Sequence, residues 1–175
     1  MLKQLVCLAL TLASLTAYAE EAPSFSLNTN GFLDKGIMPV LYTCDGKDVS
    51  PQFNITNTPP KTQSLAFILI DENAPTPPFY HWVLFNIPAS TTELKQGPDK
   101  PPAGSIAGMN SFNKPGYNGP CPPKGKAHSY VFTLYALDTK LSLPSSANGD
   151  AVTAAMKGHV IKETKFGGAY SRWIN

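Results

Sequence analysis

The stretch GPCPPKGKAHSYVFTLYALD, residues 119–138, leads from a proline-rich loop into a long apolar run, and this run decides the fold. Residues 131–137, VFTLYAL, have the length and the β-branched and aromatic content of a strand buried on both faces. Because side chains alternate between the faces of a strand, His128 and Tyr130 should project to the same side. Such residues at a strand start are more often packing residues than ligands, so the rest of the chain must decide their role.

Short apolar runs separated by turn residues continue along the chain. The 17 prolines and 13 glycines argue against a helical protein, and LAFILI at residues 65–70 is a second run of the buried type. One helix is indicated over Ala151–Lys162, with Asp150 as its cap. The segment Glu93–Tyr117 should be a long irregular loop, a type that is often functional. The strands predicted are Ser24–Leu27, Val40–Tyr42, Gln52–Ile55, Leu65–Asp71, His81–Ile87 and Tyr130–Leu137.

These elements predict a mainly β protein, an antiparallel β-sandwich with a peripheral helix near the C-terminus. At its beginning the chain has the pattern of a secretory signal peptide, with Lys3, an apolar stretch over residues 5–15 and the small residues Ala17 and Ala19 around a cleavage site. We therefore expect a signal peptide over residues 1–19 and a single domain over residues 20–175. The protein should be periplasmic or secreted.

Two cysteines, Cys44 and Cys121, remain after this cleavage. In an oxidising compartment an even pair favours a disulfide, with two free thiols as the alternative. A lone pair at this separation is not a zinc pattern.

The charge of the chain excludes some partners. Its 14 basic and 12 acidic residues are scattered, without the basic stripe of a nucleic-acid-binding module. No segment after the signal peptide is long enough to span a membrane, and no cofactor is expected.

Polar side chains gather at the ends of three predicted strands. Asp71 ends one apolar run, His81 opens the next strand, and His128 and Tyr130 open a third. If these ends converge, an aspartate beside two imidazoles would fix their tautomers and keep donors aimed inward. With the phenol and loop amides as further donors, and prolines as a rigid wall, such a pocket would bind a small anion.

At these residues the sequence resembles the phosphatidylethanolamine-binding protein family, and within it the bacterial Raf kinase inhibitor-like branch. The resemblance covers almost the whole mature chain. The matching motifs are Tyr42-Thr43-Cys44-Asp45-Gly46 with Ser50-Pro51, Asp71 to Pro75, His81-Trp82-Val83, Asn86-Ile87-Pro88, Gly116 to Pro123, His128 to Tyr130, Leu134 to Asp138, and Gly158-His159.

This resemblance implies a β-sandwich with a small pocket for phosphate, phosphorylated head groups or similar anions. Two positions depart from the family pattern: Asn73 replaces a second aspartate, and Ser129 replaces an arginine. Both departures concern the identity of the ligand and not the fold. The implied ligand-binding residues are Asp71, His81, His128 and Tyr130, with Pro75 and Pro123 in the wall and Cys121 offering a backbone amide.

The sequence therefore favours a binding protein for a small anionic or phospholipid head-group ligand that acts without catalysis, with a protein partner left open. Two alternatives use the same pocket: a hydrolase triad that includes Ser129, and a metal site made by Asp71, His81 and His128. On a strand, Ser129 would point away from His128, which disfavours the triad. A further alternative is a protein-interaction or protease-inhibitor module that acts through residues 93–117.

Overall fold

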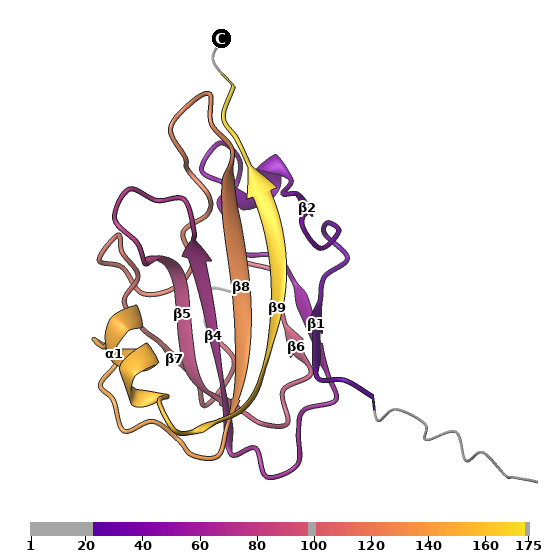
Figure 1. Cartoon of the computed structure of the whole chain (residues 1–175), viewed down its shortest axis with the longest axis vertical. Coiled ribbons are helices and arrows are strands. Elements are labelled where there is room, and N and C mark those ends of the chain that lie inside the picture. The colour runs from indigo at the N-terminus through magenta and orange to yellow at the C-terminus, as the bar shows by residue number, and fades with distance from the viewer. Residues whose placement is uncertain (1–22, 98–100, 174–175) are drawn as a thin grey trace, which may run out of the picture.

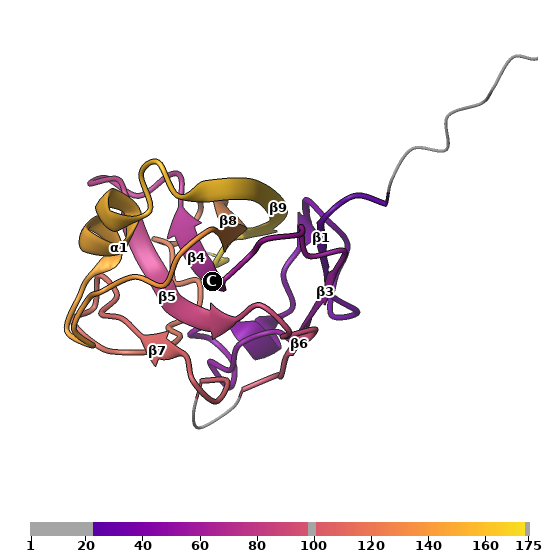
Figure 2. The ribbon, with the colours of Figure 1, turned by 90° about the horizontal axis from the view of Figure 1, so that it is seen from below.

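A computed structural model describes residues 23–97 and 101–173. The predicted signal peptide, residues 1–19, lies outside the described residues. Within the described ranges the predicted mainly β architecture is confirmed: two sheets pack as a sandwich, and one short α-helix lies against the larger sheet (Figures 1 and 2). None of the described helices has the length and apolar character needed to cross a bilayer.

The larger sheet has the strand order β2-β9-β8-β4-β5-β7, and the smaller sheet has the order β1-β3-β6. Neighbouring strands are antiparallel, except that β2 runs parallel to β9. The strands are β1 (Ser26–Asn28), β2 (Gly36–Ile37), β3 (Phe53–Thr56), β4 (Ser64–Asp71), β5 (Phe79–Pro88), β6 (Glu93–Leu94), β7 (Ile106–Ala107), β8 (His128–Leu137) and β9 (Val160–Tyr170).

Strand β4 is buried on both faces, as its continuous apolar sequence predicts. Leu65, Phe67 and Leu69 join the core between the two sheets, where Phe67 contacts aromatic rings of the neighbouring strands. The alternate residues Ala66 and Ile68 join a second core on the opposite face. Helix α1 (Gly149–Ala155) covers that second core, on the side of the large sheet away from the small one (Figure 2).

The predicted helix over Ala151–Lys162 was too long, and its predicted cap was wrong. Helix α1 ends at Ala155, and Asn148 caps it by accepting a hydrogen bond from the Ala151 amide at 3.0 Å. Asp150 instead accepts a hydrogen bond from the Tyr80 hydroxyl at 2.9 Å. Gly158, with φ of 81°, turns the chain out of the helix before β9.

Strand β9 was not predicted, because residues 160–165, VIKETK, show no apolar alternation and are mostly exposed. Pairing with β8 along nearly its whole length determines its conformation. Val40–Tyr42, predicted as a strand, is instead a 3₁₀ helix, η1, which follows Pro39. Its turn is closed by the amide of Thr43, which donates to the carbonyl of Val40 at 3.0 Å.

The adjacent glycines of β9 face opposite sides of the large sheet. A Cβ atom at Gly168 would lie 2.5 Å from Cγ of Met38, so only glycine lets the strand pack this closely on the core. A Cβ atom at Gly167 would meet nothing closer than 3.5 Å. The face on the side of Gly167 is therefore less crowded, with Lys35 and Asp34 at ordinary contact distance.

Candidate functional site

The candidate site lies at one end of the large sheet, where β4 ends beside the beginning of β8. In this register Asp71 stands opposite Tyr130. Nδ1 of His128 lies 2.7 Å from Oδ2 of Asp71, and both side chains are buried. The other carboxylate oxygen, Oδ1, accepts the amide hydrogen of Asn73 at 2.8 Å. Asp71 therefore both initiates the turn after β4 and orients His128.

His81 enters the site from β5. Its Nδ1 lies 2.8 Å from the carbonyl oxygen of Asn118, and because a carbonyl can only accept, Nδ1 carries the proton. Burial lowers the pKa of His81 below its usual value, although the Asn118 carbonyl and the Asp71 carboxylate act in the opposite direction. The folded protein therefore favours a neutral His81 whose Nε2 is not protonated.

These side chains surround a small cavity of about 140 Å³. Six of the seven predicted ligand-binding residues line it together, and Tyr130 does not. Its lining residues are Asp71, Ala74, Pro75, Phe79, His81, Phe112, Cys121, Pro122, Pro123 and His128.

Two aromatic residues of this lining, Phe79 and Phe112, were missed from the sequence. Their ring centroids lie 5.2 Å apart, and each packs within 5.4 Å of the His81 ring. Phe79 precedes His81 by two residues in the same strand, so strand alternation could have identified it. Phe112 lies in the irregular segment Glu93–Tyr117, whose described residues form only the short strands β6 and β7, and no periodicity marks it.

Tyr130 lies behind the two imidazoles and is fully buried. Its ring makes an edge contact with His81 at 5.3 Å and stacks on His128 at 6.5 Å. Burial, followed by the nearby Asp71 carboxylate, raises the pKa of Tyr130, so the phenol stays protonated. Among the described residues its hydroxyl has no hydrogen-bond partner, and its role toward a ligand stays a prediction.

The predicted disulfide is confirmed: Cys44 and Cys121 are bonded across a sequence separation of 77 residues. The Cys44 amide also donates to the Pro120 carbonyl at 3.1 Å, so two links join the segment after η1 to the wall of the cavity. Cys121 and the prolines that follow it are thereby held in place.

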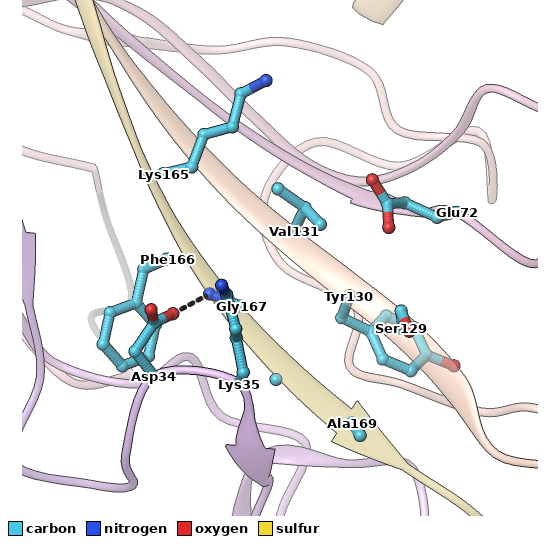
Figure 3. A pocket seen from close by; sticks show the side chains of 11 residues that line it. Asp34, Lys35, Glu72, Ser129, Tyr130, Val131, Lys165, Phe166, Gly167 and Ala169 are labelled. Atoms are coloured by element: carbon cyan, nitrogen blue, oxygen red, sulfur yellow. Dashed lines mark hydrogen bonds between the residues drawn. The ribbon is translucent and has the colours of Figure 1, made fainter.

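A larger hollow, of about 430 Å³, lies elsewhere, on the face of β8 and β9 toward which Gly167 points (Figure 3). Ser129, Val131 and Gly167 line it, with Glu72 and Asp34 at its sides. It contains neither His81 nor His128, so we place the candidate site in the smaller cavity.

This arrangement bears on the two alternative chemistries. Ser129 lines the outer hollow while His128 lines the cavity, so the geometry places the serine hydroxyl and the imidazole on different faces of β8. Over residues 23–97 and 101–173, no three His, Cys, Asp or Glu side chains are grouped to hold a metal ion. Neither alternative gains support from the structure.

The two positions that depart from the family pattern contact each other. The amide nitrogen of Ser129 donates to Oδ1 of Asn73 at 2.7 Å, and this bond ties the turn after β4 to the beginning of β8. An aspartate at position 73 could accept the same bond, so the neutral Asn73 keeps this link and removes one negative charge next to the site.

Acid should destabilise the protein through His81. Because burial lowers its pKa, the unfolded chain binds a proton at His81 at pH values where the folded chain does not. This contribution to stability is present above the unfolded pKa of about 6.5 and is lost as pH falls toward the lower folded value. We expect urea unfolding between pH 7.5 and 5 to show a steeper loss of stability in the wild type than in His81→Gln. Equal pH slopes would contradict this assignment.

Comparisons with known proteins identify the family of this chain. The family described as phosphatidylethanolamine-binding protein matches residues 28–171. A UPF0098 protein of Methanothermobacter thermautotrophicus is 45% identical over 150 residues, which cover 84% of this chain and 99% of the relative. The UPF0098 protein YbcL of Escherichia coli is 35% identical over 132 residues, which cover 71% of this chain and 69% of the relative.

Solved structures agree with this match. The crystal structure of Escherichia coli YbcL, described as a new member of the mammalian PEBP family, superposes with a TM-score of 0.79 at 30% identity, covering 84% of this chain and 98% of that one. A putative PEBP homolog from Chlamydia trachomatis gives a TM-score of 0.78 at 28% identity, covering 85% and 98%. The chain therefore belongs to the phosphatidylethanolamine-binding protein family and has its fold.

Proposed function

We propose that the small cavity binds a phosphate-bearing anion, such as a free or lipid-borne phosphoethanolamine head group, and that the protein is a binding module and not an enzyme. The observation that carries this proposal is the buried Asp71–His128 pair at the wall of the cavity. Nδ1 of His128 is hydrogen-bonded to Asp71, so Nε2 is the ring nitrogen available to a ligand. When the imidazole is protonated, Nε2 donates, and Asp71 compensates the positive charge.

The size and the wall of the cavity support the same ligand class. A cavity of about 140 Å³ has room for a phosphate-sized group. The remaining wall is made of prolines and aromatic rings, which exclude water and so strengthen a polar contact inside.

Binding of phosphoethanolamine tests this proposal directly. We expect His128→Ala and Asp71→Asn each to weaken binding about tenfold or more in isothermal titration calorimetry, because each removes a charge-assisted contact. His159→Ala is the matched control, because His159 also pairs with an aspartate, Asp138, at 2.8 Å but is exposed and outside the cavity. Wild-type affinity in both cavity variants would show that the cavity is not the binding site.

The absence of catalysis is part of this proposal and is tested separately. Ser129 faces the outer hollow, and the sulfur of Cys121 is held in the disulfide, so neither supplies a nucleophile to the cavity. Phosphoethanolamine and a phosphodiester incubated with the protein should give unchanged phosphorus NMR spectra. Protein-dependent release of inorganic phosphate would overturn this part of the proposal.

We also propose that the protein acts in the periplasm or outside the cell. The signal-peptide pattern and the Cys44–Cys121 disulfide, a bond typical of oxidising compartments, support this location. The intact mass of the protein from a periplasmic fraction should correspond to the chain without residues 1–19. A full-length chain found only in the cytoplasm would contradict it.

Phe112 would connect a bound protein partner to the wall of the cavity. This residue is partly exposed, belongs to the segment Glu93–Tyr117, and packs on His81 and Phe79 at the wall. A partner bound to that segment would therefore sense whether the cavity is filled. Pull-down with and without phosphoethanolamine tests this extension, since capture that ignores both the ligand and Phe112→Ser would exclude it.

A further inference from the structure

Large apolar side chains are exposed near the end of β9, close to the loop that supplies one wall of the cavity. Leu33, Ile37, Val40 and Trp173 are 83%, 81%, 53% and 82% exposed, and they are the four most exposed large apolar residues in the described part of the chain. Three of them belong to one segment, Leu33–Val40. Strand β2 of this segment, the helix η1 and the end of β9 lie together at the upper right of Figure 1.

Two observations place these residues along the end of β9. Ile37 pairs with Ala169 near the end of β9, and the next residue, Met38, is buried, so Ile37 projects outward. Val40 and Trp173 line a common hollow of about 330 Å³, together with Lys124 and Arg172. We call Ile37, Val40 and Trp173, with Lys35 and Lys124 beside them, the edge patch.

The charges around the edge patch include two lysines and two carboxylates, and both carboxylates are hydrogen-bonded: Asp34 accepts from the Gly167 amide at 2.7 Å. Asp45 is the carboxylate that lines the hollow, and it already has partners. Nη2 of Arg172 lies 2.9 Å from its Oδ1, and the Tyr170 hydroxyl donates to its Oδ2 at 2.7 Å. These hydrogen bonds, that of Arg172 first, lower the pKa of Asp45. Lys35 and Lys124 take part in no salt bridge within the residues that the structure describes.

We propose that the edge patch docks on the surface of a membrane that contains anionic phospholipids. An exposed tryptophan with aliphatic neighbours is the composition that enters the head-group region, and lysine side chains beside it are attracted to anionic lipids. Single apolar residues scattered over a surface are ordinary, but exposed ones gathered in one patch mark an interaction site. This docking does not depend on whether the cavity is filled.

The position of the edge patch relative to the cavity adds a consequence. The loop after the disulfide supplies Cys121, Pro122 and Pro123 to the cavity wall and then Lys124 to the edge patch. Gly125 in the same loop donates to the Arg172 carbonyl at 2.8 Å, which fixes the loop to the end of β9. Docking therefore brings one wall of the cavity to the level of the lipid head groups.

Vesicle binding tests the edge patch, and the chain carries its own reporter. Of its two tryptophans, Trp82 is buried and Trp173 is exposed, so a blue shift on adding vesicles reports Trp173. We expect the wild type to co-sediment with vesicles of phosphatidylcholine and about one third phosphatidylglycerol, less at high salt and less with phosphatidylcholine alone. Ile37→Ser/Val40→Ser should lower the partition coefficient about tenfold or more, because each change removes apolar area that docking buries.

Matched variants distinguish docking through the edge patch from nonspecific adsorption and from self-association. Val160→Ser/Ile161→Ser removes two exposed apolar side chains from the far end of β9 and should bind vesicles as the wild type does. Ile37→Ser/Val40→Ser should still bind free phosphoethanolamine as the wild type does, because neither residue lines the cavity, and this separates failure of the edge patch from failure of the cavity. The proposal is overturned if the wild type stays in the supernatant, if the Val160/Ile161 variant loses as much, or if light scattering shows a dimer that Ile37→Ser/Val40→Ser dissociates.

Discussion

Replacing both cysteines, Cys44→Ser/Cys121→Ser, should lower the free energy of unfolding by about 4 kcal/mol. The disulfide closes a loop with a sequence separation of 77 residues. In the chain-entropy model, opening a loop of this length raises the conformational entropy of the unfolded chain, which lowers the free energy of unfolding by about that amount. For a domain of this size the loss corresponds to a fall in Tm of roughly 10 °C. Urea unfolding followed by circular dichroism measures the free energy, and a thermal scan gives the Tm.

The same variant should bind the proposed ligand more weakly, because the disulfide holds Cys121 in the cavity wall. Reducing the wild type with dithiothreitol provides the control: it should reproduce the loss of stability and leave the double serine variant unchanged. A loss below about 1 kcal/mol would contradict the chain-entropy account of this disulfide.

Most of the sheet could be predicted because its strands are marked by local patterns. The runs at β4 and β8 are apolar on both faces, since both cores of the sandwich need them, and their boundaries were predicted within two residues. Strand β9 carries no such pattern in its first half, because VIKETK faces solvent and is held by backbone pairing with β8. The apolar pattern that marks a strand is therefore found in the partner, β8, and not in the first half of β9.

The candidate site was predictable to the extent that its residues lie at strand ends. Asp71 and His128 end and begin neighbouring strands, so the register that pairs Asp71 with Tyr130 brings the carboxylate to the imidazole. The sequence could not show that Tyr130 would lie behind the imidazoles, since alternation fixes the face of a side chain but not its depth. Phe112 could not be predicted for another reason: it lies in an irregular loop and is positioned by tertiary packing alone.

Asp71→Ala should destabilise the protein by about 3 kcal/mol, and the equivalent change in a second aspartate–histidine pair should cost little. Asp71 and His128 are 7% and 5% exposed, so the change leaves a buried imidazole N–H without an acceptor and also frees the Asn73 amide. Asp138 and His159 make a bond of nearly the same length, 2.8 Å, but are 52% and 47% exposed. Water replaces the lost acceptor there, so Asp138→Ala should cost at most about 1 kcal/mol.

A double-mutant cycle distinguishes the pair from the packing around it. If the cost of Asp71→Ala comes from an unpaired His128, then removing both groups in Asp71→Ala/His128→Ala should cost less than the sum of the two single changes, by about 1 kcal/mol or more. Strict additivity in urea unfolding would show that each side chain stabilises the fold separately. In that case the buried pair would not be the organising contact of the cavity, and the proposed anion site would lose the observation that carries it.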